Sequence, residues 1–205
     1  MMQRRIALAV VTGILISLPA AAAPNIVLPR PGQVGIGVQG QFGMLAKSGD
    51  MGSGLEGDLG KGFSNGPGLG IRLRYRLRYE RAIGLSFEGH QLNTRVVLPA
   101  DTAFSKLSLI TSGVEIYQLF GTRDRTTRML SVGAGLAQPS VEQNDGVTNY
   151  LLEDGLYVSA GAGLERFFFR SWAFDLSTRY FAIFQNAKTN HDFQAQAGLI
   201  FYASY

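Results

Sequence analysis

Apolar and polar residues alternate one by one along most of this chain after residue 33. Eight segments carry the alternation, and their apolar frames begin at Val34, Leu69, Ile83, Leu107, Leu130, Leu156, Trp172 and Phe193. A period of two places successive side chains on opposite faces of a β-strand, whereas helical spacing is hard to find here. The pattern therefore predicts an all-β chain of eight strands.

The fourth segment is less regular than the others. Leu107 and Leu109 lie in one frame, whereas Val114 and Ile116 lie in the other. One extra residue in a strand changes the frame, so we expect a β-bulge near Ser112–Gly113.

The connections between the segments alternate in length. Those around 80–81, 121–127 and 167–171 are short, and the others, about 47–66, 93–104, 140–154 and 185–191, are mostly longer and rich in Gly, Asn and Asp. Short turns at one end and long loops at the other are typical of an antiparallel up-and-down barrel in the outer membrane. Both ends of the barrel segment are then expected on the periplasmic side.

The two faces of the predicted strands differ in chemistry. One carries Val, Ile, Leu, Phe, Trp and Tyr, and the other carries Gly, Ser, Gln, Arg and Glu. Eight strands enclose a lumen just wide enough for side chains, so the bulky apolar residues fit better on the outside, facing lipid. Closing the sheet also pairs every backbone amide, as hydrocarbon requires. The alternative is a soluble periplasmic β-barrel binding protein whose apolar face forms its core.

The first 23 residues predict a secretory signal peptide. Arg4 and Arg5 precede the apolar run Ile6–Leu18, and Ala20–Ala23 supplies small residues for cleavage near Ala22/Ala23. As a helix the apolar run spans only about 20 Å, which is short of the ~30 Å hydrocarbon core that an anchor must cross. We expect residues 24–32 to form a periplasmic N-terminal segment and residues 33–205 to form the barrel.

Composition narrows the class of protein. The 205 residues include no cysteine, which excludes disulfide scaffolds, thiolate metal sites and thiol catalysis. Only 17% of residues are charged, and the net charge of +4 includes the two arginines of the leader. The remaining charge is too small for an obvious nucleic-acid footprint.

The leader, the eight alternating segments and the aromatic end of the chain together resemble the small outer-membrane β-barrel superfamily. Its members include the OmpA transmembrane domain, OmpX and opacity-type surface proteins. The resemblance implies that Phe201 and Tyr205 form a C-terminal signal for the barrel-assembly machinery, although Ala203 departs from the usual bulky residue. Aromatic residues at strand ends are placed to form interfacial girdles, namely Phe42, Tyr75, Tyr79, Trp172, Phe174, Phe201 and Tyr205.

A row of arginines is the least generic feature of the sequence. Arg72, Arg74, Arg76 and Arg78 share one frame, and on a lipid face each would cost roughly 2–4 kcal/mol, so we expect them in the lumen. Buried cations need anions. We predict a lumenal charge network that combines them with Glu88, His90, Glu115, Glu165, Asp175 and Arg179. A hairpin pivot at Arg81 would pair Arg74 with Glu88, Arg72 with His90 and Arg76 with Ser86.

The network has two possible roles. A salt-bridged plug would specify strand register and close the lumen. A ring of arginines would instead attract anions and make the lumen a narrow channel for small anionic or apolar solutes. Eight strands leave little room for a channel, so the plug is the favoured interpretation.

Motifs for chemistry are weak. The G-x-G-x-x-G match at 35–40 lies inside a strand with no following helix, so we interpret its glycines as small lumenal residues. Ser86, Glu88 and His90 share one strand face at spacings of ~6–7 Å, too far for direct Ser–His contact. Two histidines are too few for a zinc site, and Asp50, Glu56 and Asp58 fit no EF-hand spacing. His191 and Asp192 are expected in a solvated outer loop.

The sequence therefore predicts an integral outer-membrane barrel of structural or surface-interaction type, with no catalysis, cofactor or metal. Its expected partners are outer-membrane lipid and, during biogenesis, the barrel-assembly machinery. A monomer without nucleic-acid partners is expected.

Overall fold

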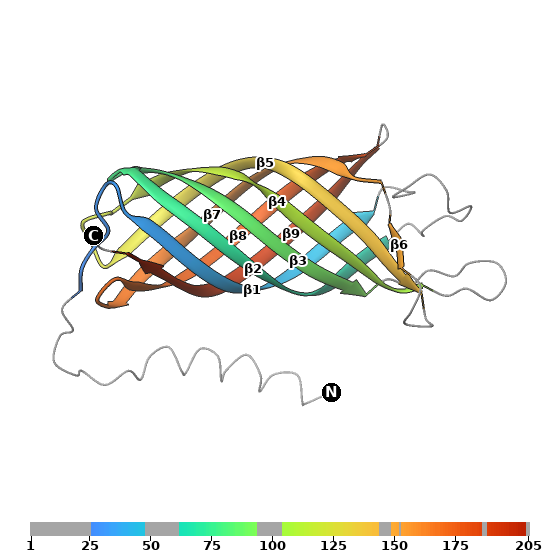
Figure 1. Ribbon diagram of the computed structural model, residues 1–205, viewed down its shortest axis with the longest axis horizontal. Coiled ribbons are helices and arrows are strands. Elements are labelled where there is room, and N and C mark those ends of the chain that lie inside the picture. Colours follow the sequence, from blue (N-terminus) through green and yellow to red (C-terminus); the bar gives the residue numbers. More distant parts are fainter. Residues whose placement is uncertain are drawn as a thin grey trace, which may run out of the picture.

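The computed structural model describes residues 26–47, 62–93, 104–143, 149–151, 153–185 and 188–203. The proposed leader, the acidic residues of the first loop and Tyr205 lie outside these residues. The described residues form nine strands, which are labelled in Figure 1: β1 (Val34–Lys47), β2 (Gly62–Arg78), β3 (Arg81–Asn93), β4 (Phe104–Phe120), β5 (Thr126–Gln143), β6 (Asn149–Leu151), β7 (Gly155–Phe169), β8 (Trp172–Gln185) and β9 (Lys188–Tyr202). No helix within the described ranges is long and apolar enough to cross a membrane.

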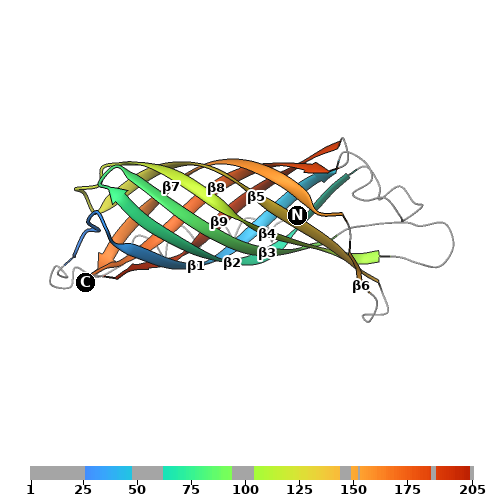
Figure 2. The same cartoon turned by 45° about the horizontal axis from the view of Figure 1, so that its top comes forward.

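Eight of these strands form one closed antiparallel barrel. Neighbours in the chain pair with each other, β1 pairs with β9, and β4 pairs with β5, so the sheet has no free edge. The ninth strand, β6, has three residues and pairs only with the far end of β5. The prediction of an eight-stranded up-and-down barrel is confirmed at the level of the fold (Figure 2).

The strands are strongly staggered. Directly paired residues followed around the barrel from Gly35 on β1 lead back to Leu45, ten residues along the same strand. With strands ~4.8 Å apart and a rise of ~3.3 Å per residue, this offset tilts the strands by about 40°. Each row of paired residues therefore climbs along the barrel axis as it passes from β1 to β9.

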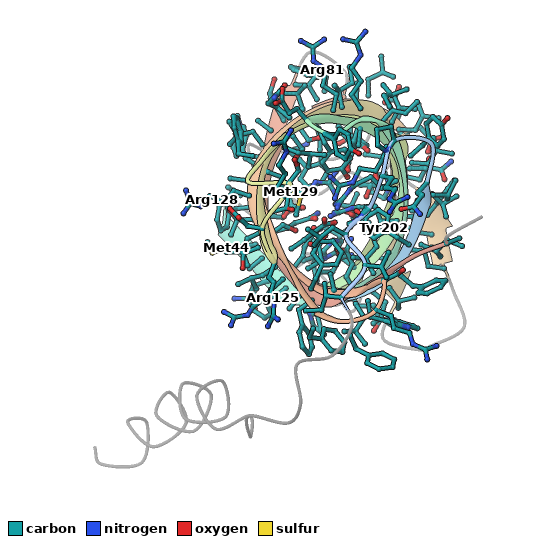
Figure 3. The ribbon with its side chains drawn as sticks, turned by 90° about the vertical axis from the view of Figure 1, so that its left-hand side faces the viewer. Met44, Arg81, Arg125, Arg128, Met129 and Tyr202 are labelled. Atoms are coloured by element: carbon teal, nitrogen blue, oxygen red, sulfur yellow. The ribbon has the colours of Figure 1, made fainter. Side chains whose placement is uncertain are left out.

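The apolar frame faces outward. Val158 and Leu199 are 50% and 41% exposed, whereas Arg74 is fully buried inside the barrel. This arrangement is the opposite of what the soluble alternative requires, because the charged side chains and not the aliphatic frame occupy the middle of the interior. Figure 3, a view along the barrel, shows Tyr202 and Met129 inside the wall, with Met44 and Arg128 outside.

The expected bulge near Ser112–Gly113 is wrong. Strand β4 pairs residue for residue with β3 from Lys106 to Gln118, without a shift. Leu107 and Leu109 are buried inside the barrel, and the outward frame begins to carry large residues only from Ile110 onward. The change of apolar frame thus reflects a change in the interior and not an inserted residue.

The register predicted for the β2–β3 hairpin is also wrong. The turn is Tyr79–Glu80, and an irregularity between Arg76 and Arg78 shifts the pairing. Glu88 consequently faces Gly70 across the strands. Strands β8 and β9 also run further than predicted, because Gln185 pairs directly with Lys188.

One end of the barrel is closed by short turns at 79–80, 121–125 and 170–171, and we call it the short-turn end. The described part of the N-terminal segment lies against it. The Gly32 amide donates to the Arg76 carbonyl (2.7 Å), and the Val27 amide donates to the Arg170 carbonyl (3.0 Å). Ile26 and Leu28 pack against a buried cluster formed by Phe167, Ala173, Ile200 and Tyr202.

Candidate functional site in the charged interior

One ion-paired network in the described interior of the barrel joins four arginines and four carboxylates that come from five strands. Every one of these side chains is at most 6% exposed, and the set is Arg72, Arg74 and Arg76 on β2, Glu88 on β3, Glu115 on β4, Glu165 on β7, and Asp175 and Arg179 on β8. Each lies in the frame opposite the outward apolar residues. This network is therefore balanced in formal charge, as buried ions require.

Near the short-turn end, Glu165 is the shared anion. It forms an ion pair with Arg74, and its Oε2 lies 2.8 Å from Nη2 of Arg76. The Tyr202 hydroxyl donates to Oε1 of Glu165 over 2.7 Å. Arg74 also reaches Asp175 at 3.1 Å, and its guanidinium stacks 4.3 Å from the ring of Tyr117.

Further along the axis, Arg72 and Arg179 share two carboxylates. Arg72 lies 3.3 Å from Glu88 and 3.6 Å from Glu115, and Arg179 forms ion pairs with both. Arg72 is also 3.9 Å from Asp175, which pairs with Arg74 in the group near the short-turn end. One continuous chain of ion pairs thus runs from Arg76 to Arg179.

Amide side chains line the next level. Gln196 accepts a hydrogen bond from Arg72 (2.7 Å) and donates to Gln41 (2.9 Å) and Gln194 (2.9 Å). Gln194 donates to Asp192 over 2.7 Å. These amides thus provide hydrogen-bond partners for Arg72 and Asp192.

An apolar cluster follows toward the end with the longer connections. Its members are Leu45, Leu92, Leu107, Leu109, Ala137, Tyr157, Phe181 and Ile183, all at most 2% exposed. Phe181 lies against both layers, because the Arg179 guanidinium sits 4.6 Å from its ring. Along the axis, the buried side chains of the interior are thus ions, then amides, then hydrocarbon.

The structure brings together nine of the ten residues expected in the charge network, although His90 takes no ion pair. His90 is buried beside Gly43 and Asp192, at the level between the amides and the apolar cluster. The expectation for Arg78 is wrong: this side chain is exposed, because the irregularity before the turn takes it out of the inward frame. Four arginines therefore face four carboxylates where five were expected.

Sequence reasoning missed Asp192 and the apolar cluster. Asp192 is 1% exposed and not in a solvated loop, because β9 begins already at Lys188. Its frame, shared with Gln194 and Gln196, was the available signal. Leu107 and Leu109 carried the signal for the apolar cluster, but their frame was attributed to a bulge.

Ser86 and His90 of β3 share no hydrogen bond in the described interior. Neither ring nitrogen of His90 has a hydrogen-bond partner there, so Ser86 and His90 do not form a nucleophile–base pair. No group of three or more His, Cys, Asp or Glu that could hold a metal ion occurs among the described residues. Of the G-x-G-x-x-G glycines, Gly35 and Gly37 face inward, whereas Gly40 faces outward.

The described aromatic residues of the expected girdles are all exposed on the outer face: Phe42, Tyr75, Tyr79, Trp172, Phe174 and Phe201. The Trp172 and Phe201 rings contact each other with centroids 5.1 Å apart.

Comparisons with known proteins agree with this geometry. No protein-family model matches the chain, and no curated protein matches it. Among solved structures, Neisserial surface protein A superposes with a TM-score of 0.61 at 15% identity, over 82% of this chain and 96% of that one. Ail, the attachment invasion locus protein of Yersinia pestis, gives 0.54 at 11% identity over 84% and 99%.

The outer membrane protein OprG from Pseudomonas aeruginosa gives a TM-score of 0.53 at 11% identity, over 87% of this chain and 100% of that one. Identities this low establish the fold alone. The chain has the fold of the small eight-stranded outer-membrane β-barrel superfamily.

Proposed function

We propose that this protein is an integral outer-membrane barrel of structural or surface-interaction type, with a lumen closed by its charge network and with no catalytic activity. Its signal peptide directs export. It assembles as a monomer with the help of the barrel-assembly machinery, its direct partner is outer-membrane lipid, and it binds no nucleic acid. The long connections present the surface through which it contacts its environment.

The outward apolar face supports the membrane location. Aliphatic side chains such as Leu69, Val38 and Val132 are 57–72% exposed on the outer face of the closed sheet. In water, a protein with so large an exposed apolar surface would tend to aggregate, whereas in a membrane, lipid covers this surface.

The packing of the interior is the observation that carries the closed lumen. Arg74, Arg76 and Glu165 are at most 1% exposed, and they fill the section directly above the turns. The apolar cluster fills the other half. Arginines that are already paired with carboxylates are not free to coordinate a passing anion. A plug therefore explains the network better than a selectivity filter does.

Two measurements test the proposal. Heat-modifiable gel mobility and fractionation with the outer membrane test the location; a protein that stays soluble in the periplasm contradicts it. Conductance in planar bilayers tests the lumen, and the intact protein is expected to give no steady openings. Steady anion-selective openings that disappear in Arg74→Ala, but persist in the exposed control Arg81→Ala, would establish the channel instead.

A further inference from the structure

The outer face carries an apolar groove of about 810 Å³ across β5, β7, β8 and β9. Its floor is a row of directly paired small side chains, Ala162, Thr178 and Ala195, which starts beside Leu130. Leu164 and Leu176 form the side nearer the short-turn end. Neighbouring outward positions carry mostly large residues, so the small row makes a depression in an otherwise thick apolar face.

The groove runs obliquely to the barrel axis. Rows of paired residues climb away from the short-turn end in the order β5, β7, β8, β9, as the stagger of the barrel requires. Three strand spacings of ~4.8 Å separate Leu130 from Ala195, so the row is about 14 Å long from β5 to β9. The groove thus begins near the short-turn end and rises obliquely toward the middle of the apolar face.

A basic hollow lies at the lower end of the groove. It measures about 270 Å³ and shares Phe120 and Arg128 with the groove, and Arg125, Thr126 and Asp124 complete its polar lining. Figure 3 shows Arg125 and Arg128 projecting outward on the same side of the barrel.

A third arginine stands next to this hollow. Arg166 is exposed, pairs directly with Thr126, and is the diagonal neighbour of Arg128, within reach of long side chains. Within the described ranges none of these three arginines forms an ion pair, and Asp124 is the one carboxylate in the lining. Among the described residues, three arginines against one carboxylate give this group an excess of positive charge.

The arginines lie at the level of the aromatic girdle. Arg128 pairs with Phe120 on one side and Leu164 on the other, and Arg166 pairs with Phe174. Aromatic side chains at this height mark the boundary between hydrocarbon and headgroups. Unpaired cations at that boundary, with an apolar groove rising from them, match a molecule with an anionic head and an acyl chain.

We propose that this groove and hollow form a binding site for one anionic phospholipid of the leaflet at the short-turn end. Arg125, Arg128 and Arg166 donate to its phosphodiester, and one acyl chain lies over Ala162, Thr178 and Ala195. The proposal rests on the membrane location proposed above.

Native mass spectrometry of the refolded full-length mature chain tests the site. The protein, in neutral detergent, is titrated with phosphatidylglycerol and with phosphatidylcholine of the same acyl chains. One phosphatidylglycerol is expected to bind at least about tenfold more tightly than phosphatidylcholine. Equal affinities for the two lipids would overturn the proposal.

Variants separate the head from the groove. The double variant Arg128→Gln/Arg166→Gln is expected to bind phosphatidylglycerol no better than phosphatidylcholine, whereas Arg78→Gln/Arg81→Gln, with the same charge change at another turn of the same end, retains the preference. Equal losses in both double variants would show a general charge effect and would refute a site.

Ala162→Leu fills the groove and leaves the arginines in place, so it is expected to weaken phosphatidylglycerol binding several-fold. Ala134→Leu is the matched control, because Ala134 also faces outward but lies outside the groove. Unchanged binding in Ala162→Leu contradicts the acyl-chain placement, and tighter binding of lipid A than of phosphatidylglycerol contradicts the choice of lipid.

Heat-modifiable mobility in lipid vesicles is recorded for each variant. If the unsubstituted protein shows no heat-modifiable mobility in vesicles, the membrane location is refuted. If it folds as a barrel but shows no preference for phosphatidylglycerol, only the binding site is refuted.

Discussion

Glu165 is the position at which the charged interior can be tested most directly. It is fully buried, and it is the anion shared by Arg74, Arg76 and the Tyr202 hydroxyl. Glu165→Gln keeps the shape of the side chain and removes its charge. Arg74 then retains Asp175, but Arg76 has no other carboxylate within 4 Å in the described part of the chain.

The expected loss of stability is large. Removing one partner from a buried ion pair leaves an uncompensated charge and costs ~3–5 kcal/mol. Replacing both partners by neutral groups costs less, because no lone ion remains. Glu165→Gln should therefore lower the free energy of unfolding by ~3–5 kcal/mol, and Arg76→Met/Glu165→Gln should lower it by less than the sum of the two single changes.

Urea unfolding of the barrel in lipid vesicles measures these differences. Trp172 is the only tryptophan, and its place at the rim makes its fluorescence a reporter of the folded barrel. Glu80→Gln is the control, because Glu80 is exposed in the turn of the same end and should change stability by less than ~0.5 kcal/mol. A loss below ~1 kcal/mol for Glu165→Gln, indistinguishable from this control, would refute the view that the network holds the interior together.

Three further changes probe other parts of the barrel. A side chain at Gly113 would overlap the Tyr157 hydroxyl, so Gly113→Val should lower the free energy of unfolding by ~1–3 kcal/mol, whereas Gly89→Val, with open space around it, should leave it unchanged. Val132→Arg places a charge on the middle of the outer face and should cost ~2–4 kcal/mol in vesicles; no effect would argue against lipid contact there. Tyr202→Phe removes a buried donor and should cost ~1–3 kcal/mol in the same unfolding assay.

The alternation of side chains was readable from the sequence because it is a local property. A period of two sends Val38 and Gly37 to opposite faces wherever the strand lies, and the chemistry of the two faces indicates which one is inside. The number of barrel strands and the inward direction of Arg72, Arg74 and Arg76 follow from the same rule.

The exceptions arose where the backbone departs from regular pairing. Arg78 keeps the frame of the other arginines in the sequence, but the irregularity beside the Tyr79–Glu80 turn rotates it outward. Leu107 and Leu109 belong to a buried apolar cluster and do not indicate a bulge. A run of apolar residues in one frame predicts an outer face only where the interior is polar.

The partners of each ion were decided by closure of the sheet. Arg74 and Glu165 are 91 residues apart, and they meet because a stagger of ten residues brings β2 and β7 to the same height across the lumen. Alternation along a strand determines inside or outside for each residue; the height at which a side chain enters the lumen depends on how all eight strands are offset. That offset is a property of the closed cylinder, so no single segment of sequence contains it.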